Sequence, residues 1–448
     1  MHKLVRFTRD MVVSTGALLL LLIAWVTVVW MLWWGTVIGK PGHHIALVIL
    51  VIFLICTLVG GWFMLRRWPK HVGRGVLGLG VLLLLAVATL SVVGHIKYRA
   101  AVHRWQAVGG VMSPWALLPT PLPAEENAFT YYRLAYEAMP AGNPYEAVRA
   151  SFDATTSNFP WDADTATLQT VRDQYARTLS YFYQGAAMER CVYPVDQGES
   201  TFFIISHIGP ARTLARLAVL DAILAHRDGD DAAAIANLRA ALALAGHLAQ
   251  QNTGIIDYLV GLAIDALAVD AVEKLYADRH DEALQTLLQS TSVDWRKVAA
   301  NALSIDVAGI IEWFGKWREW NRSDLKTHVW LGLKPLNQAI FLDYATAHLT
   351  AIQQPRYQLK IDPPAKESLP DWAWIARVFA AEYRGMAHLT ARLEVRHTMM
   401  RLAIGLRDYK AQRGKYPESL QAIQSDDMTI VDPWSGKPLH YERVDEGL

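Results

Sequence analysis

Three long runs of the sequence are strongly apolar and lack charged side chains. They cover residues 11–38, 45–65 and 75–94. A helix needs about 20 residues to cross the hydrocarbon core of a bilayer, so each run is long enough for one span. A cleaved signal peptide would account only for the first run, whose apolar part exceeds that of a typical signal peptide. The pattern therefore predicts a three-helix membrane anchor over residues 1–96.

Positive charges beside these runs predict how the anchor is oriented. Seven Lys and Arg residues lie at the N-terminus and in the second loop, whereas four lie in the first loop and just after the third run. Cytoplasmic flanks are enriched in these residues. We therefore expect a bacterial inner-membrane protein with a cytoplasmic N-terminus, in which the residues after 95 are periplasmic. The spans lack Asp, Glu, Lys and Arg at mid-depth, which disfavours a transport function.

The remainder of the chain has mainly helical periodicity. Residues 97–123 are rich in proline and predict a linker, because proline restricts the backbone and removes a hydrogen-bond donor. Two or three short helices are expected in residues 124–190. The clearest pattern lies in residues 211–250, where two apolar-periodic stretches flank an Asp-Gly-Asp turn at 228–230. This pattern predicts an antiparallel helical hairpin.

Further helices are expected toward the C-terminus. Residues 254–277 are apolar almost all round, which predicts a helix in the middle of a bundle. The other predicted elements are helices at 281–288, 294–320 and 371–412 and a small β-hairpin from 428–431 and 439–444. The predicted fold class is mainly α, with a soluble helical domain over residues 124–362, then a long helix and a small tail over residues 363–448.

Charge and cysteine content exclude some classes of protein. The chain has 43 Lys and Arg against 42 Asp and Glu, which argues against a nucleic-acid binder, since such proteins carry a basic surplus. Cys56 falls in an apolar run and Cys191 is the one other cysteine. The soluble part therefore cannot close an internal disulfide.

Four acids interrupt apolar helical stretches and are candidate buried carboxylates: Asp257, Asp265, Asp270 and Asp306. Buried carboxylates can be catalytic because burial raises their pKa. More often they are paired, and the predicted hairpin offers Arg212, Arg216 and Arg239 as partners. The sequence is compatible with both catalytic and paired carboxylates.

Glu394 and His397 have the i, i+3 spacing by which helical bundles bind paired iron or manganese. Such a site needs a second copy of the motif, and the sequence has none. The alternative interpretation is a solvated helix face flanked by Arg392, Arg396 and Arg401. The chain also lacks a Gly-rich phosphate loop, a nucleophile elbow and a zinc-binding HExxH, so we predict no catalytic residues, no cofactor and no metal.

Trp313, Trp317 and Trp320 are spaced i, i+4 and i+7 and form one aromatic stripe with basic neighbours. Such a stripe is often part of a core. It can also form a docking face for a partner protein or for the lipid headgroup layer. A sugar-binding platform is a third interpretation.

Two resemblances concern the helical part. Residues 229–244, with alanines at 234 and 241, resemble the second half of a tetratricopeptide repeat, although no 34-residue copy follows. Residues 120–300 resemble a group of uncharacterised bacterial envelope proteins of planctomycete type. The matching positions are Glu126-Asn127-Ala128, Tyr131-Tyr132, the hairpin at 212–249 and residues 262–268. This resemblance implies a helical fold and no known activity.

The tail carries a third resemblance, to the C-terminal module of the major pseudopilins of type II secretion. The matching positions are Tyr416, Pro417, Asp432, Pro433, Trp434 and Gly436. The resemblance implies a long helix that runs into a turn, followed by a loop and a small sheet in which Trp434 is largely buried. The N-terminal features of that family are absent from this sequence.

These observations favour a non-enzymatic function. We expect a membrane-anchored, periplasm-facing scaffold or accessory subunit of an inner-membrane or envelope protein complex. Its expected partners are membrane lipids and other membrane or envelope proteins, with no nucleic acid. The alternative is a periplasmic hydrolase or metalloenzyme that uses the buried acids or Glu394 and His397, and a further alternative is a component associated with secretion or pili.

Overall fold

The computed structural model describes most of the chain after the first two predicted spans, which lie outside the described residues. The described ranges are 69–140, 161–194, 207–251, 253–276, 283–284, 286–287, 293–320, 326–359, 362–381, 383–423 and 430–443. The chain divides into two compact units. One contains residues 1–93 and 331–333, and the other, here called the helical unit, contains residues 94–330 and 334–448.

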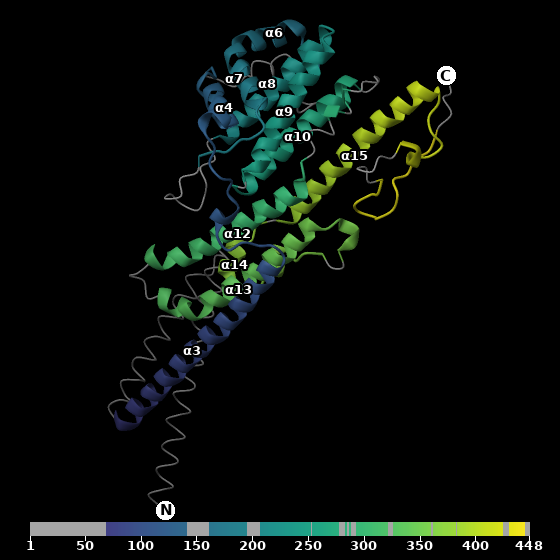
Figure 1. Ribbon diagram of the computed structural model, residues 1–448. Coiled ribbons are helices and arrows are strands. Elements are labelled where there is room, and N and C mark those ends of the chain that lie inside the picture. Colours follow the sequence, from purple (N-terminus) through teal and green to yellow (C-terminus); the bar gives the residue numbers. More distant parts are fainter. Residues whose placement is uncertain are drawn as a thin grey trace, which may run out of the picture. The chain divides into compact units, whose positions relative to one another are not determined.

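The described residues are predominantly helical, which confirms a mainly α fold (Figure 1). No strand occurs among them, and one antiparallel β-bridge joins Val431 to Pro438. The α-helices are α3 (Pro69–Ala107), α4 (Ala128–Glu137), α6 (Thr165–Gln174), α7 (Ala176–Ala186), α8 (Ile208–Arg227), α9 (Asp231–Gln250), α10 (Ile255–Tyr276), α12 (Trp295–Trp320), α13 (Lys326–Gln353), α14 (Trp374–Phe379) and α15 (Arg384–Arg413).

Helix α3 contains the third predicted span and continues to Ala107, well into the segment predicted as a linker. Ala101 and Trp105 of this segment are fully buried in the core of the helical unit. The Trp105 indole donates to the carbonyl of Val111, which lies beyond the end of the helix, over 2.8 Å. The backbone N–H of Val111 in turn donates to Ser304 Oγ over 2.8 Å. The linker prediction is therefore wrong for this segment, because its aromatic and apolar side chains pack rather than face solvent.

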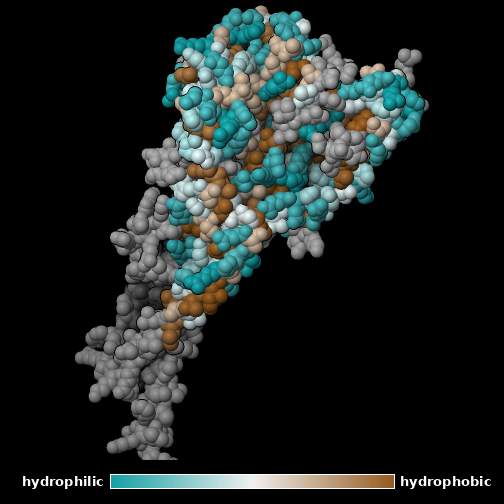
Figure 2. Space-filling view, viewed as in Figure 1, coloured by the Kyte–Doolittle hydropathy of each residue, from teal (hydrophilic) through white to brown (hydrophobic). Residues whose placement is uncertain are grey.

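Side chains of α3 are described from Leu85 onward, and the first part of this stretch is apolar and exposed. Leu85, Val92 and Ile96 are 58%, 60% and 63% exposed. Figure 2 shows the hydrophobic surface of this stretch of α3.

Helices α8 and α9 form the predicted hairpin and pack against each other over their length. Gly229 has a φ of +81° in the connecting turn, and Asp230 caps α9 by accepting from the backbone N–H of Ala233 over 2.9 Å. By length and composition, α9 is the one helix within the described ranges that could cross a membrane. However, 61% of its apolar window is buried inside the protein, as in a core helix.

Helix α10 packs against α8, α9, α12 and α15. This confirms the prediction that the apolar helix at 254–277 lies in the middle of the bundle, since a helix needs apolar side chains on every side that is covered. Helix α12 agrees closely with the predicted helix at 294–320. The helices α4, α6 and α7 agree with the short helices expected before residue 190.

The observed helices differ from the predictions in two regions of the chain. Helix α13 was not predicted, because Pro335 lies inside it and proline normally ends a helix. The single helix predicted over 371–412 is two helices, α14 and α15, since the backbone turns to an extended conformation at Ala380. Tyr344 stabilises this break by donating its hydroxyl to the carbonyl of Ala381 over 2.7 Å.

The C-terminal tail begins where Gly414 ends α15 with a φ of +75°. Leu402 of α15 forms a small apolar core with Leu420 and Ile430 of the tail. Of the predicted β-hairpin, the described part of the tail contains the β-bridge and the turn at 432–437, while residues 428, 429 and 444 lie outside the described residues.

Candidate functional site

Three helices bring a group of polar side chains together in the helical unit. Asp265 lies in the middle of α10, and Arg296 lies in the first turn of α12. Glu394, His397 and Arg401 follow one another along one face of α15, because residues spaced i, i+3 and i+7 share a helix face. Helices α10, α12 and α15 pack against one another, so these side chains converge.

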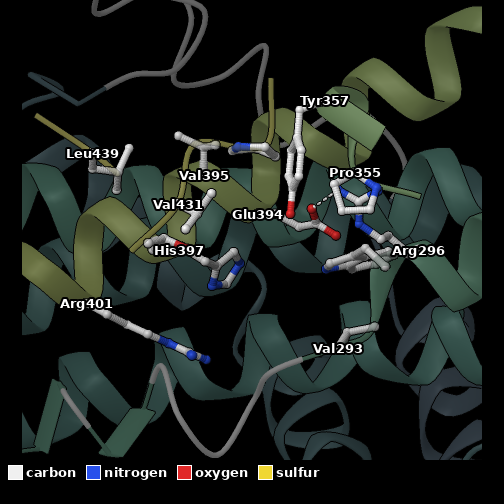
Figure 3. Close-up of a pocket in the computed structure, with 13 residues that line it drawn as sticks. Val293, Arg296, Pro355, Tyr357, Glu394, Val395, His397, Arg401, Val431 and Leu439 are labelled. Atoms are coloured by element: carbon white, nitrogen blue, oxygen red, sulfur yellow. Dashed lines mark hydrogen bonds and ion pairs between the residues drawn. The ribbon is translucent and has the colours of Figure 1, made fainter. Parts of the chain in front are cut away.

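A cleft of about 370 Å³ lies over this group. Most of its wall is apolar or aromatic, from Val293, Trp295, Pro355, Tyr357, Val395, Val431, Pro433 and Leu439. In Figure 3, Val395, Val431 and Leu439 gather on one side, and Arg296 and Pro355 lie on the other. A cavity with apolar walls and a few polar groups has the character of a ligand pocket.

Asp265 is fully buried behind His397. Its Oδ1 lies 2.5 Å from His397 Nε2, and its Oδ2 accepts from the Trp295 indole N–H over 2.8 Å. In the imidazole tautomer that carries its proton on Nε2, His397 donates this hydrogen bond to Asp265. In the neutral imidazole this leaves Nδ1 as an acceptor, which is the arrangement of a general base.

Glu394 pairs with Arg296 in the cleft. The distance from Arg296 Nη2 to Glu394 Oε2 is 2.5 Å, and Arg296 Nη1 donates to the carbonyl of Gln354 over 2.7 Å. Burial raises the pKa of the Glu394 carboxyl, and the bond to Arg296 opposes that rise. The contact with Gln354 fixes the guanidinium, so Arg296 is held in place from a second side.

The predicted solvated helix face is therefore wrong for Glu394 and His397, because both side chains line a cleft and contact other helices. Within the described part of the chain, no three His, Cys, Asp or Glu side chains are grouped so that they could hold a metal ion. The i, i+3 motif is bound to Arg296 and Asp265 instead.

The other candidate acids have partners of different kinds. Buried Asp257 accepts from the hydroxyl of Thr253 and lies 2.7 Å from His207 Nε2. Asp270 is partly exposed and pairs with Arg396 of α15.

Asp306 accepts from the Tyr383 hydroxyl over 3.0 Å, and burial raises its pKa. The partners of these acids include two histidines, Tyr383 and Arg396, which the sequence does not indicate as their partners. The sequence indicates that these acids can be paired, but which side chains pair with them depends on tertiary packing.

Of the tryptophan stripe, Trp313 has a described side chain, and those of Trp317 and Trp320 lie outside the described residues. The Trp313 ring packs against Phe379 of α14, with ring centroids 4.7 Å apart. Trp313 is partly buried, so at least this member of the stripe contributes to packing within the chain.

The tail motif forms a turn whose residues partly close the cleft. Asp432 accepts from the backbone N–H of Trp434 over 3.0 Å. Gly436 has a φ of +69°, and a Cβ added there would lie 2.7 Å from an atom of the Tyr357 ring. Pro433 accepts from the backbone N–H of Tyr357 over 3.2 Å. Trp434 is only partly buried, contrary to expectation, because the apolar core of the tail is made by other side chains.

At the start of the tail, Pro417 is buried and accepts from the hydroxyl of Tyr441 over 2.9 Å. Tyr416 lies under the ammonium group of Lys410, 4.6 Å from the ring centroid. These contacts show that the Tyr-Pro turn packs against the end of α15.

Sequence reasoning missed the roles of Trp295, Arg296 and Tyr357. These residues are far in sequence from the α15 residues that they face, and no local spacing points to them. Arg401 was noted only as a flanking charge. A comparison with known protein families, curated proteins and solved structures finds no match.

Proposed function

We propose that the chain is a membrane-anchored accessory subunit or scaffold whose helical unit lies on the periplasmic side of a bacterial inner membrane. The observation that carries this proposal is the exposed apolar stretch of α3, in which Leu85, Val92 and Ile96 are each more than half exposed. Large exposed apolar stretches indicate contact with a membrane or a partner. Leu85 and Val92 lie in the third uncharged run of the sequence, at 75–94, and Ile96 follows it closely.

The proposed partners are membrane lipids and other inner-membrane or envelope proteins. The tetratricopeptide-like and pseudopilin-like resemblances extend the proposal to protein binding and to an association with secretion or pili. The described α8–α9 hairpin supports a helical repeat-like element, but most of its side chains are already buried within the chain.

Protease protection in native vesicles tests the topology. The stretch at 411–415 is exposed and contains Arg413 and Lys415, so trypsin should cut there when it has access. We expect cleavage in spheroplasts and protection in inverted membrane vesicles until detergent is added. Release of the uncut chain by alkaline carbonate, or cleavage in inverted vesicles alone, would contradict the proposal.

A second candidate function is favoured by one observation, the Asp265–His397 hydrogen bond at the wall of the cleft. It supports a hydrolase that activates water by general base catalysis. His397 Nδ1 would take a proton from water as the oxygen of that water attacks an ester carbonyl. The C–O bond to the leaving group then breaks, and the leaving oxygen receives the proton from His397.

Hydrolysis of p-nitrophenyl acetate by the purified full chain tests this second candidate. His397→Gln should lower the rate by about two orders of magnitude or more if His397 is the base. His388→Gln, on the same helix but outside the cleft, is the matched control and should leave the rate unchanged. Equal rates for His397→Gln and the wild-type chain would exclude this function.

A further inference from the structure

The cleft contains two arginines and one carboxylate in its wall: Arg296, Arg401 and Glu394. His397 also lines the cleft, and its partner Asp265 lies buried behind it. Arg296 therefore places a guanidinium, a preferred partner of carboxylates, at the wall of the cleft.

Glu394 shows which anion fits beside Arg296. Its carboxylate accepts from Arg296 Nη2, with 2.5 Å between Nη2 and Oε2, so a carboxylate group already occupies this position. A third of the Glu394 side-chain surface is exposed, at 33%, so the side chain can turn toward solvent. Arg296 would keep its orientation after that movement, because Gln354 also holds the guanidinium.

The rest of the cleft suits an apolar body. Trp295, Tyr357 and Pro433 are among the side chains that line it, and apolar or aromatic side chains make up most of its wall. Figure 3 shows Tyr357 beside the Glu394–Arg296 pair, so an apolar group attached to a carboxylate would meet an aromatic ring. An aromatic or aliphatic body gains free energy when such walls cover it.

We propose that the cleft binds a small carboxylic acid with an apolar body, whose carboxylate replaces Glu394 on Arg296. The position of Glu394 makes it an internal competitor of that ligand. The tail contributes Val431, Pro433 and Leu439 to the wall, so a bound ligand also ties the tail to the helical unit. The proposal rests on the same cleft as the second candidate function, and its ligand has the chemistry of an ester-hydrolysis product.

Equilibrium dialysis with radiolabelled benzoate and the full chain in nanodiscs measures this binding directly. Benzamide has the same ring and shape without the charge, and its affinity should be lower by about tenfold or more. Phenyl phosphate distinguishes the class of anion, because its tetrahedral head has three terminal oxygens where the position of Glu394 holds two. Equal binding of benzoate and benzamide, or tighter binding of phenyl phosphate, would overturn the proposal.

Two variants with opposite effects keep the test informative even if one of them folds poorly. Arg296→Gln should weaken benzoate binding by about tenfold, because a charged hydrogen bond is lost. Glu394→Gln should tighten it about threefold or more, because the competing charge is removed. Arg392→Gln is the matched control, since Arg392 is exposed on α15 outside the cleft. Unchanged affinity in Glu394→Gln would contradict the proposal.

Binding is measured without turnover, so its failure differs from a failure of the second candidate function. Benzoate binding without ester hydrolysis contradicts only the hydrolase. Hydrolysis that depends on His397, with no benzoate binding and no response to Glu394→Gln, contradicts only the carboxylate site.

Discussion

His397 of α15 and Asp265 of α10 are 132 residues apart in sequence, and their side chains meet with Nε2 2.5 Å from Oδ1. The contact is buried on the Asp265 side and opens to a cleft on the His397 side. It joins the central helix of the bundle to the longest helix of the C-terminal region. A residue at the wall of a cleft is thereby oriented by a group in the core.

Substitution of Asp265 tests this relationship. Asp265→Ala removes both acceptors from His397 and Trp295 and leaves their donors buried, so it should lower the free energy of unfolding by about 2–4 kcal/mol. Asp270→Ala, on the same helix at a partly exposed ion pair, should cost less than about 1 kcal/mol. Chemical denaturation of the detergent-solubilised chain, followed by near-ultraviolet circular dichroism, measures both. Equal losses would show that the buried contact has no special importance.

The pH dependence of stability follows from His247. Burial lowers the pKa of His247 from 6.5 to about 4, although its contacts with backbone carbonyls oppose this. The folded state therefore binds the proton less readily than the unfolded state. Stability is fully present above about pH 6.5 and is lost as the pH falls toward 4.

His348 is shifted in the same direction, to about 4, and adds to the effect. Each group contributes at most about 1.4 kcal/mol per pH unit in this window. His247→Gln should reduce the slope of stability against pH between 6.5 and 4, as measured by urea denaturation at a series of pH values. A slope identical to that of the wild-type chain would contradict the assignment.

The packing after α3 can be tested at a glycine. A Cβ added at Gly110 would lie 2.1 Å from an atom of the Trp105 ring, so Gly110→Ala forces the indole or the backbone to move. We expect a loss of about 1–3 kcal/mol in the free energy of unfolding. Gly385→Ala has open space around its Cβ in α15 and should be neutral or slightly stabilising. If Gly110→Ala is as harmless as Gly385→Ala, residues 97–123 behave as the proline-rich linker that the sequence predicts.

The tail offers a contrast between two apolar side chains. Ile430 is 6% exposed in the small core with Leu402 and Leu420, whereas Trp434 is only partly buried. Ile430→Ala should therefore destabilise the packing of the tail by about 2–4 kcal/mol. Trp434→Ala should have a smaller effect. Limited proteolysis after Arg413 reports the difference as a faster rate of cleavage. A larger effect of Trp434→Ala would instead support the pseudopilin-like packing expected from the sequence.

The parts of the fold that could be predicted are those set by local patterns. The α8–α9 hairpin has apolar periodicity, a glycine turn and the Asp230 cap, all within 40 residues, and its predicted bounds agree closely with the structure. Helix α13 was missed because Pro335 argues against a helix by a local rule that tertiary packing overrides. At the break between α14 and α15, Tyr344 donates a hydrogen bond to Ala381, a contact that no local sequence pattern indicates.

The candidate site was predictable only in pieces. In the sequence, Asp265 stands out as an acid in an apolar helix. Glu394 and His397 stand out by their i, i+3 spacing. Their assembly in one cleft could not be predicted, because Arg296 lies 98 residues from Glu394 and only the packing of α12 on α15 brings them together.

Native mass spectrometry of the full chain, extracted from its own membranes in mild detergent, tests the proposed accessory function most directly. We expect a particle that contains the chain and at least one other inner-membrane or envelope protein in a fixed ratio. The ratio should persist when the detergent-to-protein ratio is raised, since a built interface resists dilution better than adventitious contact. A monodisperse monomer that carries only lipid and detergent would contradict the account.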